Sequence, residues 1–173
     1  MGSKSDYHPV NDRHGHVVVS WKGLTIIWGG CKSEPASNSI FWDPKIIHCH
    51  QDGIWIPIST KGQIPPPTVR AAGEVIGDNL YIAGGQLFDC YFTNEIYRLD
   101  LKTWVWSKLE PNGTRPLKSA KMVSWISGEK IFVFGGFGSD IKLKQDLDTF
   151  NNLIECSGDP IHNKVVELNN FVN

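Results

Sequence analysis

Residues 131–136 read Ile-Phe-Val-Phe-Gly-Gly, a short apolar run that ends on a pair of glycines. The same arrangement occurs twice earlier, as Leu-Thr-Ile-Ile-Trp-Gly-Gly at residues 24–30 and as Leu-Tyr-Ile-Ala-Gly-Gly at residues 80–85. From one glycine pair to the next the spacing is 55 and then 51 residues. A fixed period near 50 residues indicates a repeat architecture, and this length is typical of one blade of a β-propeller.

Other residues keep the same phase as the glycine pairs. Three further pairs are separated by 51 residues: Trp55 and Trp106, Gly62 and Gly113, and Pro65 and Pro116. We expect the repeated Trp to cover the face between two blades and to donate its indole N–H to a backbone acceptor. Because glycine lacks a Cβ, the glycine pairs should let neighbouring backbones approach closely and let the chain turn sharply. These structural repeat glycines are Gly29, Gly30, Gly84, Gly85, Gly135 and Gly136.

Apolar runs separated by turn residues predict four strands in each full period. The first repeat gives strands at 16–21, 24–29, 45–50 and 54–59, and the second gives strands at 70–76, 79–85, 94–100 and 104–110. The third gives 120–126 and 131–136, then an insertion over 137–162 and a segment over 163–169 that mirrors 94–100. The only weak helix candidate lies within the insertion, around 145–153. The sequence therefore predicts an all-β fold.

The domain organisation follows from this count. We expect an N-terminal tail over residues 1–12 and a partial propeller over 13–173, with repeats at about 13–66, 67–117 and 118–173. That is about two and three-quarter four-stranded blades, whereas a propeller closes with about four to eight. The prediction is therefore an open arc, part of a larger protein or of an assembly of arcs, because exposed strand edges favour association.

Composition excludes several classes of partner. The chain has 17 Lys and Arg against 18 Asp and Glu, and no strongly basic stretch, which argues against a nucleic-acid binder. The sequence has no apolar run of about 18 residues, so we expect no membrane span. The cysteines Cys31, Cys49, Cys90 and Cys156 are widely spaced with no CxxC motif. This spacing favours reduced thiols and a cytoplasmic or nuclear location.

The compact ligand cluster in the sequence is His48-Cys49-His50. On a strand, His48 and His50 point to one face and Cys49 to the other. Two histidines can begin a metal site, but a third ligand is needed, and no spacing supports either Asp52 or His14 in that role. We therefore expect surface or interblade histidines, no metal and no cofactor. The sequence also lacks a nucleophile elbow or phosphate loop, which favours a non-enzymatic protein.

The three in-register strand–Gly-Gly motifs resemble the kelch family, as do Asn-Glu-Ile-Tyr-Arg-Leu-Asp at 94–100 and Trp-Ser-Lys-Leu at 106–109. The resemblance covers about residues 13–172, and Arg13 to His16 is similar to the Arg-x-x-His that ties neighbouring strands in kelch blades. The chain is most similar to kelch-domain-containing substrate receptors of cullin-2 RING ubiquitin ligases, six-bladed propellers that bind C-terminal degrons often ending in glycine. In that subfamily a Lys at the position of Lys121 and an aromatic at the position of Phe137 lie at the pocket. The alternatives are a solvated Lys121 and a blade-packing Phe137.

The resemblance implies a protein-interaction propeller segment of a ubiquitin-ligase substrate receptor, with protein partners that include C-terminal peptide degrons. Elongin and cullin-2 would be partners only if a longer C-terminal region exists. One alternative is a kelch scaffold that binds actin or a transcription cofactor without a ligase role. A further alternative is a metal-dependent kelch enzyme that uses His48 and His50.

Overall fold

The computed structural model describes residues 9–32, 40–88, 91–110, 117–138 and 166–168. The described residues contain no α-helix, and their regular structure consists of strands β1 to β17. The all-β fold predicted from the sequence is therefore confirmed. The strands form three successive antiparallel blades together with short pairings near one end of each blade.

The first blade has the strand order β2-β3-β6-β7. Its strands are β2 (Val17–Trp21), β3 (Leu24–Trp28), β6 (Ile46–Gln51) and β7 (Ile54–Ser59). The hairpin turn between β6 and β7 places Asp52 and Gly53 both at positive φ, 51° and 79°. This is the backbone geometry of the tight hairpin turns that match the strand twist.

The second blade has the order β8-β12-β11-β10-β9, in which β8 (Lys61–Gly62) is supplied by the linker after the first blade. The other strands are β9 (Ala72–Ile76), β10 (Asn79–Gln86), β11 (Phe92–Asp100) and β12 (Val105–Leu109). β8 pairs in parallel with β12, and a side chain at Gly62 would collide with the backbone of Trp106. The in-phase Gly113 lies outside the described residues.

The third blade has the order β14-β15-β17. Its strands are β14 (Val123–Ser127), β15 (Lys130–Phe134) and β17 (Val166–Leu168). β17 pairs with β15 as β11 pairs with β10, which confirms the expected match to 94–100 for residues 166–168; the rest of the segment 163–169 lies outside the described residues. The helix candidate at 145–153 lies outside the described residues.

Short pairings complete the sheets at one end of the blades. β1 (Arg13–His14) pairs with β4 (Cys31–Lys32), which pairs with β5 (Ile40–Phe41). β13 (Ser119–Ala120) pairs with β16 (Phe137–Gly138). Residues 137 and 138, the first two of the insertion expected over 137–162, therefore pair with the start of their own repeat.

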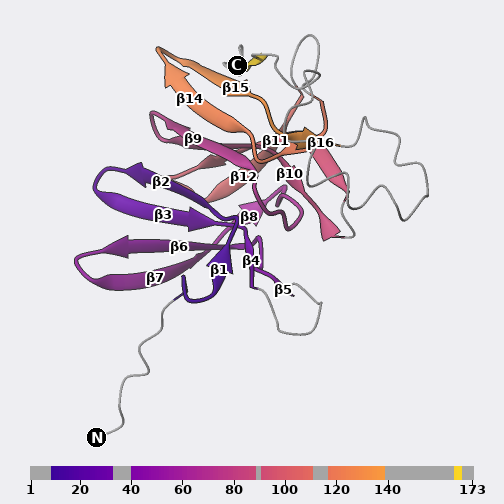
Figure 1. Cartoon of the computed structure of the whole chain (residues 1–173). Helices are drawn as coiled ribbons and strands as arrows, with labels where there is room; N and C mark the ends of the chain where they lie inside the picture. Colours follow the sequence, from indigo (N-terminus) through magenta and orange to yellow (C-terminus); the bar gives the residue numbers. More distant parts are fainter. Residues whose placement is uncertain (1–8, 33–39, 89–90, 111–116, 139–165, 169–173) are drawn as a thin grey trace, which may run out of the picture.

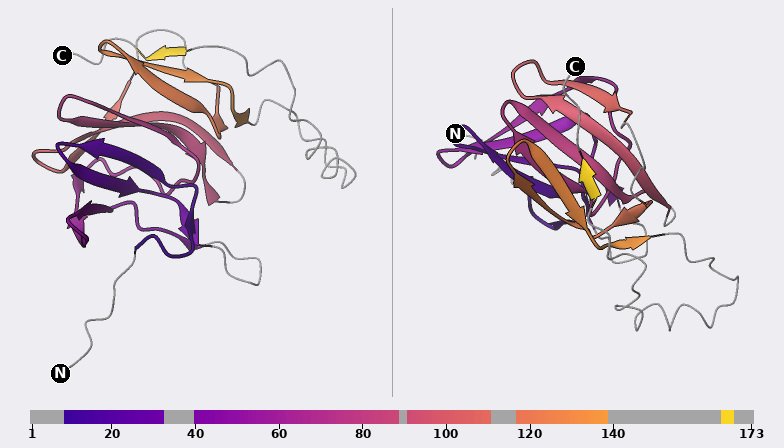
Figure 2. Two further views of the ribbon diagram at one scale, coloured as in Figure 1. Left: turned by 60° about the vertical axis from the view of Figure 1, so that its left-hand side comes forward. Right: turned by 90° about the horizontal axis from the view of Figure 1, so that it is seen from above.

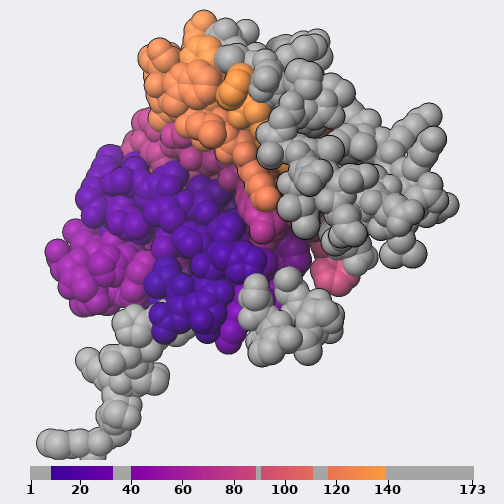
Figure 3. Space-filling view, viewed as in Figure 1, coloured from indigo at the N-terminus to yellow at the C-terminus, as the bar shows by residue number. Residues whose placement is uncertain are grey.

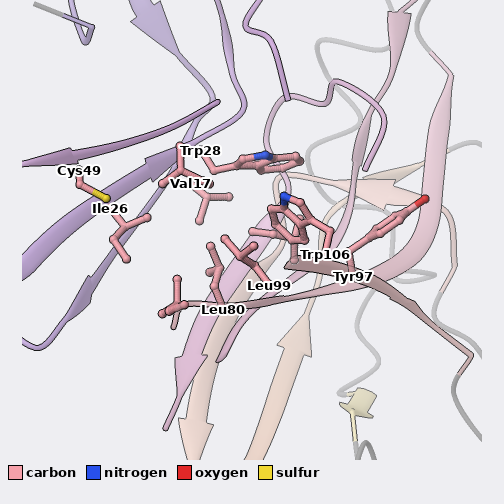
Figure 4. Packing of buried hydrophobic residues seen from close by; sticks show 11 residues of the cluster. Val17, Ile26, Trp28, Cys49, Leu80, Tyr97, Leu99 and Trp106 are labelled. Carbon is pink, nitrogen blue, oxygen red and sulfur yellow. The ribbon is translucent and has the colours of Figure 1, made fainter. Parts of the chain in front are cut away.

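The three blades stack face to face like an open fan, in chain order (Figures 1 and 2). The first buried cluster lies between blades one and two, and its centre is the contact of Trp28 with Trp106, whose ring centroids are 5.7 Å apart (Figure 4). A second cluster, which includes Ala83, Ile96 and Ile131, joins blades two and three. The core therefore lies between blades, as expected for a partial propeller.

The repeated Trp behaves as predicted in packing but not in hydrogen bonding. Trp106 is 1 % exposed and lies between the first two blades. Its indole N–H donates to the hydroxyl of Thr60 at 3.0 Å, not to a backbone carbonyl. The repeat pattern predicts that the Trp106 ring is buried. It does not predict the hydrogen-bond acceptor, because Thr60 lies in the linker and has no recognisable counterpart in the sequence repeat.

The glycine pairs mark close backbone approaches between blades. A Cβ on Gly29 would lie 2.9 Å from the carbonyl oxygen of Thr68, and one on Gly84 would lie 2.7 Å from that of Ser119. Thr68 and Ser119 are themselves 51 residues apart and begin the following blades. Both glycines also have positive φ, so any side chain there would be strained as well as crowded.

Candidate functional site

The three repeats share one antiparallel contact at the end of the blade where the inner strand begins. It pairs His14 with Cys31, Val69 with Gln86, and Ala120 with Phe137. We call the surface formed by residues 13–16, 68–71 and 119–122, with the paired positions 31, 86 and 137, the collar. Figure 1 places the strands β1, β4 and β16 of the collar on one side of the fan.

The collar has a left-handed residue at the same position in every repeat. Gly15, Arg70 and Lys121 have φ of 64°, 58° and 59°. A backbone hydrogen bond of 2.6 Å from the N–H of Arg70 to the carbonyl of Gly15 joins the first two, and one of 3.0 Å from the N–H of Lys121 to the carbonyl of Arg70 joins the next two. These residues therefore form a continuous backbone chain that crosses from blade to blade.

At two of these three positions the left-handed backbone is strained, because Arg70 and Lys121 have a Cβ and glycine does not. An L-residue with a side chain pays about 1–2 kcal/mol in the left-handed conformation. The first repeat has glycine there, whereas the next two have Arg70 and Lys121. Strained residues of this kind cluster at functional sites, so the observation directs attention to the two cations.

The surroundings of the two cations differ. Arg70 is half-buried, and its Nη1 donates to Oε1 of Gln86 at 3.1 Å, which ties the guanidinium to the collar strand that contains Gln86. Lys121 is exposed. Phe137 is half-buried and contacts Phe92 edge-on, with ring centroids 5.6 Å apart.

The structure thus brings the two site residues expected from the family resemblance close together. Phe137 pairs with Ala120, and Lys121 follows Ala120 directly in the chain. The sequence analysis missed Arg70 and Gln86. The signal was available, because Arg70 lies 51 residues before Lys121 and Gln86 lies 51 residues before Phe137.

In the first repeat, the collar is a buried polar cluster. Arg13 is 6 % exposed and donates from Nε to the carbonyl of Gly29 at 2.8 Å. Its Nη1 lies 3.0 Å from Nδ1 of His48, and its guanidinium lies 4.6 Å from the ring centroid of Trp42. The expected role of this segment in tying strands together is confirmed for Arg13.

Burial controls the histidines of this cluster. Burial, followed by the nearby Arg13 charge, lowers the pKa of His48 to about 4. Burial also lowers the pKa of His16, with further contributions from Arg13 and His14. The imidazoles of His16 and His48 are therefore neutral at pH 7.

His48 and His50 have different neighbours. His48 contacts both Arg13 and Trp42, whereas the ring centroids of His50 and Trp55 are 4.6 Å apart. In the described part of the chain, no group of three or more His, Cys, Asp and Glu residues is placed to hold a metal ion. The metal-site alternative has no third ligand within these residues.

The side chains of Cys31 and Cys49 are buried, and the Cys31 Sγ lies 3.4 Å from Nε2 of His14. Burial raises the pKa of Cys49 to about 11, so this thiol is protonated and unreactive at neutral pH. Cys90 and Cys156 lie outside the described residues. Within the described ranges, no helix is long and apolar enough to cross a membrane.

Comparison with known proteins agrees with the repeat pattern. A family model described as the KLHDC2/KLHL20/DRC7 Kelch-repeats domain matches residues 15–159. Kelch domain-containing protein 2 of Homo sapiens is 30 % identical over 135 residues, which cover 73 % of this chain and 33 % of that protein.

Similarity extends to a second group of proteins. The host cell factor homolog hcf-1 of Caenorhabditis elegans is 30 % identical over 136 residues, which cover 75 % of this chain and 16 % of that protein. Host cell factor of Drosophila melanogaster is 26 % identical over 132 residues, which cover 74 % of this chain and 8 % of that protein. The chain thus spans about a third or less of the length of these relatives.

Proposed function

The chain belongs to the kelch-repeat family, and from that premise we propose that its collar binds the free C-terminal carboxylate of partner proteins. Kelch repeats form protein-interaction domains. The finer proposal is that Arg70 and Lys121 attract the carboxylate, while Phe137 forms an apolar wall beside it. In the intact protein this recognition would serve a substrate receptor of a cullin-RING ubiquitin ligase that binds C-terminal degrons.

The observation that carries the proposal is the pair of strained cations. Arg70 and Lys121 occupy the left-handed position that glycine fills in the first repeat, and one backbone hydrogen bond links them. A fold that needed only the backbone geometry would be more stable with glycine at both positions. The side chains therefore have a use that offsets the strain, and two adjacent cations on a rigid surface suit an anionic ligand.

A terminal carboxylate fits these two side chains in different ways. The planar guanidinium of Arg70 can donate two parallel hydrogen bonds to a carboxylate, whereas the Lys121 ammonium acts as a point charge. The contact between Arg70 and Gln86 fixes the guanidinium before binding, which reduces the entropy lost on association. Small residues at the peptide end, such as glycine, would approach this crowded backbone most closely.

The test is the binding of a fluorescent peptide that ends in Gly-Gly, with either a free or an amidated C-terminus. We expect the free acid to bind and the amide to lose most of its affinity. Arg70→Gln should weaken binding of the free acid by about tenfold or more, because hydrogen bonds to charged groups contribute about 1.5–3 kcal/mol. Lys61→Gln is the matched control, since Lys61 is an exposed cation on β8 at the outer edge of the second blade.

Equal binding of acid and amide would refute carboxylate recognition. Equal losses for the Arg70 and Lys61 variants would show that only overall charge matters, which would also contradict the proposed site. A loss confined to Arg70→Gln and Lys121→Gln would support it.

A second candidate function is a kelch scaffold that binds a fixed partner, such as actin or a transcription cofactor, without a ligase role. The similarity to host cell factor proteins favours this candidate. Co-precipitation of elongin and cullin-2 with the longest natural form of the protein distinguishes the two. Recovery of both supports the ligase proposal, and their absence together with a stable partner favours the scaffold.

A further inference from the structure

Two exposed aromatic side chains lie on the turn that follows the collar residue Gln86. Phe88 is 63 % exposed and Tyr91 is 69 % exposed. Two backbone hydrogen bonds close this turn, one of 2.7 Å from the N–H of Leu87 to the carbonyl of Tyr91 and one of 3.4 Å from the N–H of Tyr91 to the carbonyl of Phe88. The turn therefore presents both rings to solvent, and neighbouring exposed apolar groups of this size commonly mark interaction sites.

The Phe88 ring also contacts the first blade. Its centroid lies 6.2 Å from that of Phe41, and the two ring planes meet at 64°. Phe41 lies on β5 and pairs with Cys31, which in turn pairs with His14 of the collar. Phe88 therefore bridges the first and second blades beside the collar. We call the surface formed by Phe41, Phe88 and Tyr91 the aromatic shelf.

An equivalent contact between the second and third blades differs in exposure. Phe92 is the repeat equivalent of Phe41, because each pairs with the collar position of its own repeat. The Phe92 ring contacts Phe137 of the third blade, and both of these side chains are half-buried. Phe88, in contrast, keeps most of its side chain in solvent. Contact between blades does not require this exposure, so Phe88 offers a ring surface that the packing of the blades does not use.

The position of the shelf separates it from the surfaces that join one blade to another. Figure 3 shows the second blade between the first and the third. The shelf is formed at the junction of the first and second blades, by Phe41 and Phe88, and these two blades already pack on each other. It is therefore not on a face that a further repeat would cover.

The shelf is continuous with the proposed carboxylate site through Gln86. The Gln86 side chain accepts a hydrogen bond of 3.1 Å from Nη1 of Arg70, and Phe88 lies two residues further along the chain. Two residues span at most about 7 Å. An extended peptide advances by about 3.3 Å per residue, so a peptide whose carboxylate lies at Arg70 reaches the shelf with a side chain about two to four residues before its last residue.

We propose that the aromatic shelf binds a large apolar side chain of the same peptide, about two to four residues before its C-terminal residue. This inference rests on the proposed function, in which the carboxylate is the anchor, and it adds selectivity among C-terminal sequences. Terminal glycines bury little apolar surface, so contacts further up the peptide have to supply part of the affinity. The open ring of Phe88 can pack edge-on or offset against an aromatic side chain. The substrate class is therefore a C-terminal segment with small last residues and a large apolar residue before them.

The test measures the fluorescence anisotropy of labelled peptides with the longest natural form of the protein. The host peptide contains only Ser and Gly, ends in Gly-Gly with a free acid, and carries either Phe or Ser at one position upstream of the glycines. We expect the best Phe peptide to bind about fivefold to tenfold more tightly than its Ser counterpart, as for partial burial of one aromatic side chain. Phe88→Ser should abolish this difference and leave the affinity for the Ser peptide unchanged.

Three controls separate the shelf from the carboxylate site. Ile54→Ser is the matched variant, because Ile54 is 62 % exposed but lies on β7, at the edge of the first blade's sheet, and it should keep the preference for Phe. Arg70→Gln should weaken the Phe and Ser peptides by the same factor, so their affinity ratio should persist. An amidated Phe peptide should lose most of its affinity.

Binding that depends on the free acid but shows no preference for Phe would overturn the shelf and leave the carboxylate site in place. A preference that survives Phe88→Ser would also overturn it, because another surface would then be responsible. Weaker binding of the Ser peptide by Phe88→Ser would do the same, since it would show a change in the collar and not the loss of one contact. Equal binding of acids and amides, with no effect of Arg70→Gln, would refute the carboxylate site and with it the shelf as a part of that site.

Discussion

Replacing Lys121 by glycine should make the protein more stable and a weaker binder at the same time. Lys121 has φ of 59° and an exposed side chain, so its substitution removes left-handed strain with little loss of packing. Relief of that strain contributes about 1–2 kcal/mol. The greater freedom of glycine in the unfolded chain costs about 0.5–1 kcal/mol. The net gain in the free energy of unfolding is about 0.5–1 kcal/mol, which corresponds to a rise in Tm of about 2 °C for a chain of this size.

The assay combines urea unfolding with peptide binding on the same three proteins. Lys121→Ala is the control that separates strain from charge, because alanine keeps the left-handed penalty while it removes the cation. We expect Lys121→Ala to unfold like the parent protein, and both variants to lose up to about fivefold in affinity for the free-acid peptide, as for an exposed ion pair. A glycine variant no more stable than the alanine variant would refute the strain argument. Undiminished binding in both variants would remove Lys121 from the site.

Three further predictions concern the blades themselves. Gly84→Ala should lower the free energy of unfolding by about 2–5 kcal/mol, because residue 84 stays at positive φ and the new methyl group meets the next blade. Gly135→Ala should lower it by only about 1–2 kcal/mol, because among the described residues no atom lies within 4 Å of the added Cβ. Because the pKa of His48 is lowered to about 4, the unfolded state binds its proton first as the pH falls from 6.5. Stability should therefore fall between pH 6.5 and 4 by up to about 3 kcal/mol, and His48→Gln should flatten that loss in a pH series of urea titrations. Trp106→Phe removes the hydrogen bond to Thr60 and part of the ring, and should cost about 2 kcal/mol by urea unfolding, with little effect on peptide binding.

The sequence predicts the blades well because a repeat averages out local ambiguity. A single Gly-Gly after an apolar run is a weak signal, but Gly29, Gly84 and Gly135 in phase predict the strands, the turns and the close approach of one blade to the next. Within the segment 163–169, the described residues 166–168 pair with β15 as predicted for the same reason, since the match of this segment to 94–100 indicated the partner strand. Features that occur once were missed, as with the parallel strand β8 that the linker adds to the second blade.

The candidate site was harder to predict because the equivalent residues of the three repeats differ in type. Gly15, Arg70 and Lys121 differ completely in side chain, and only their shared positive φ and backbone hydrogen bonds identify them as one position. A sequence search for repeated residue types does not detect a position that is shared only through its backbone conformation. The resemblance to known kelch proteins supplied Lys121, but Arg70 needed either the coordinates or a deliberate search at the repeat spacing.

The contrast between these two kinds of position explains how one scaffold can acquire a binding surface. Contacts such as that of Gly29 with the carbonyl of Thr68 leave no room for a side chain, so these positions can hold only glycine. At Lys121 the hydrogen bond to the preceding blade joins backbone atoms, from the N–H of Lys121 to the carbonyl of Arg70, and the Lys121 side chain takes no part in it. Side chains there can vary at a cost of about 1–2 kcal/mol each, which a stable stack of blades tolerates. The collar is therefore the place where this fold can change its ligand without changing its architecture, and for that reason binding variants should be sought there before the loops at the outer edge.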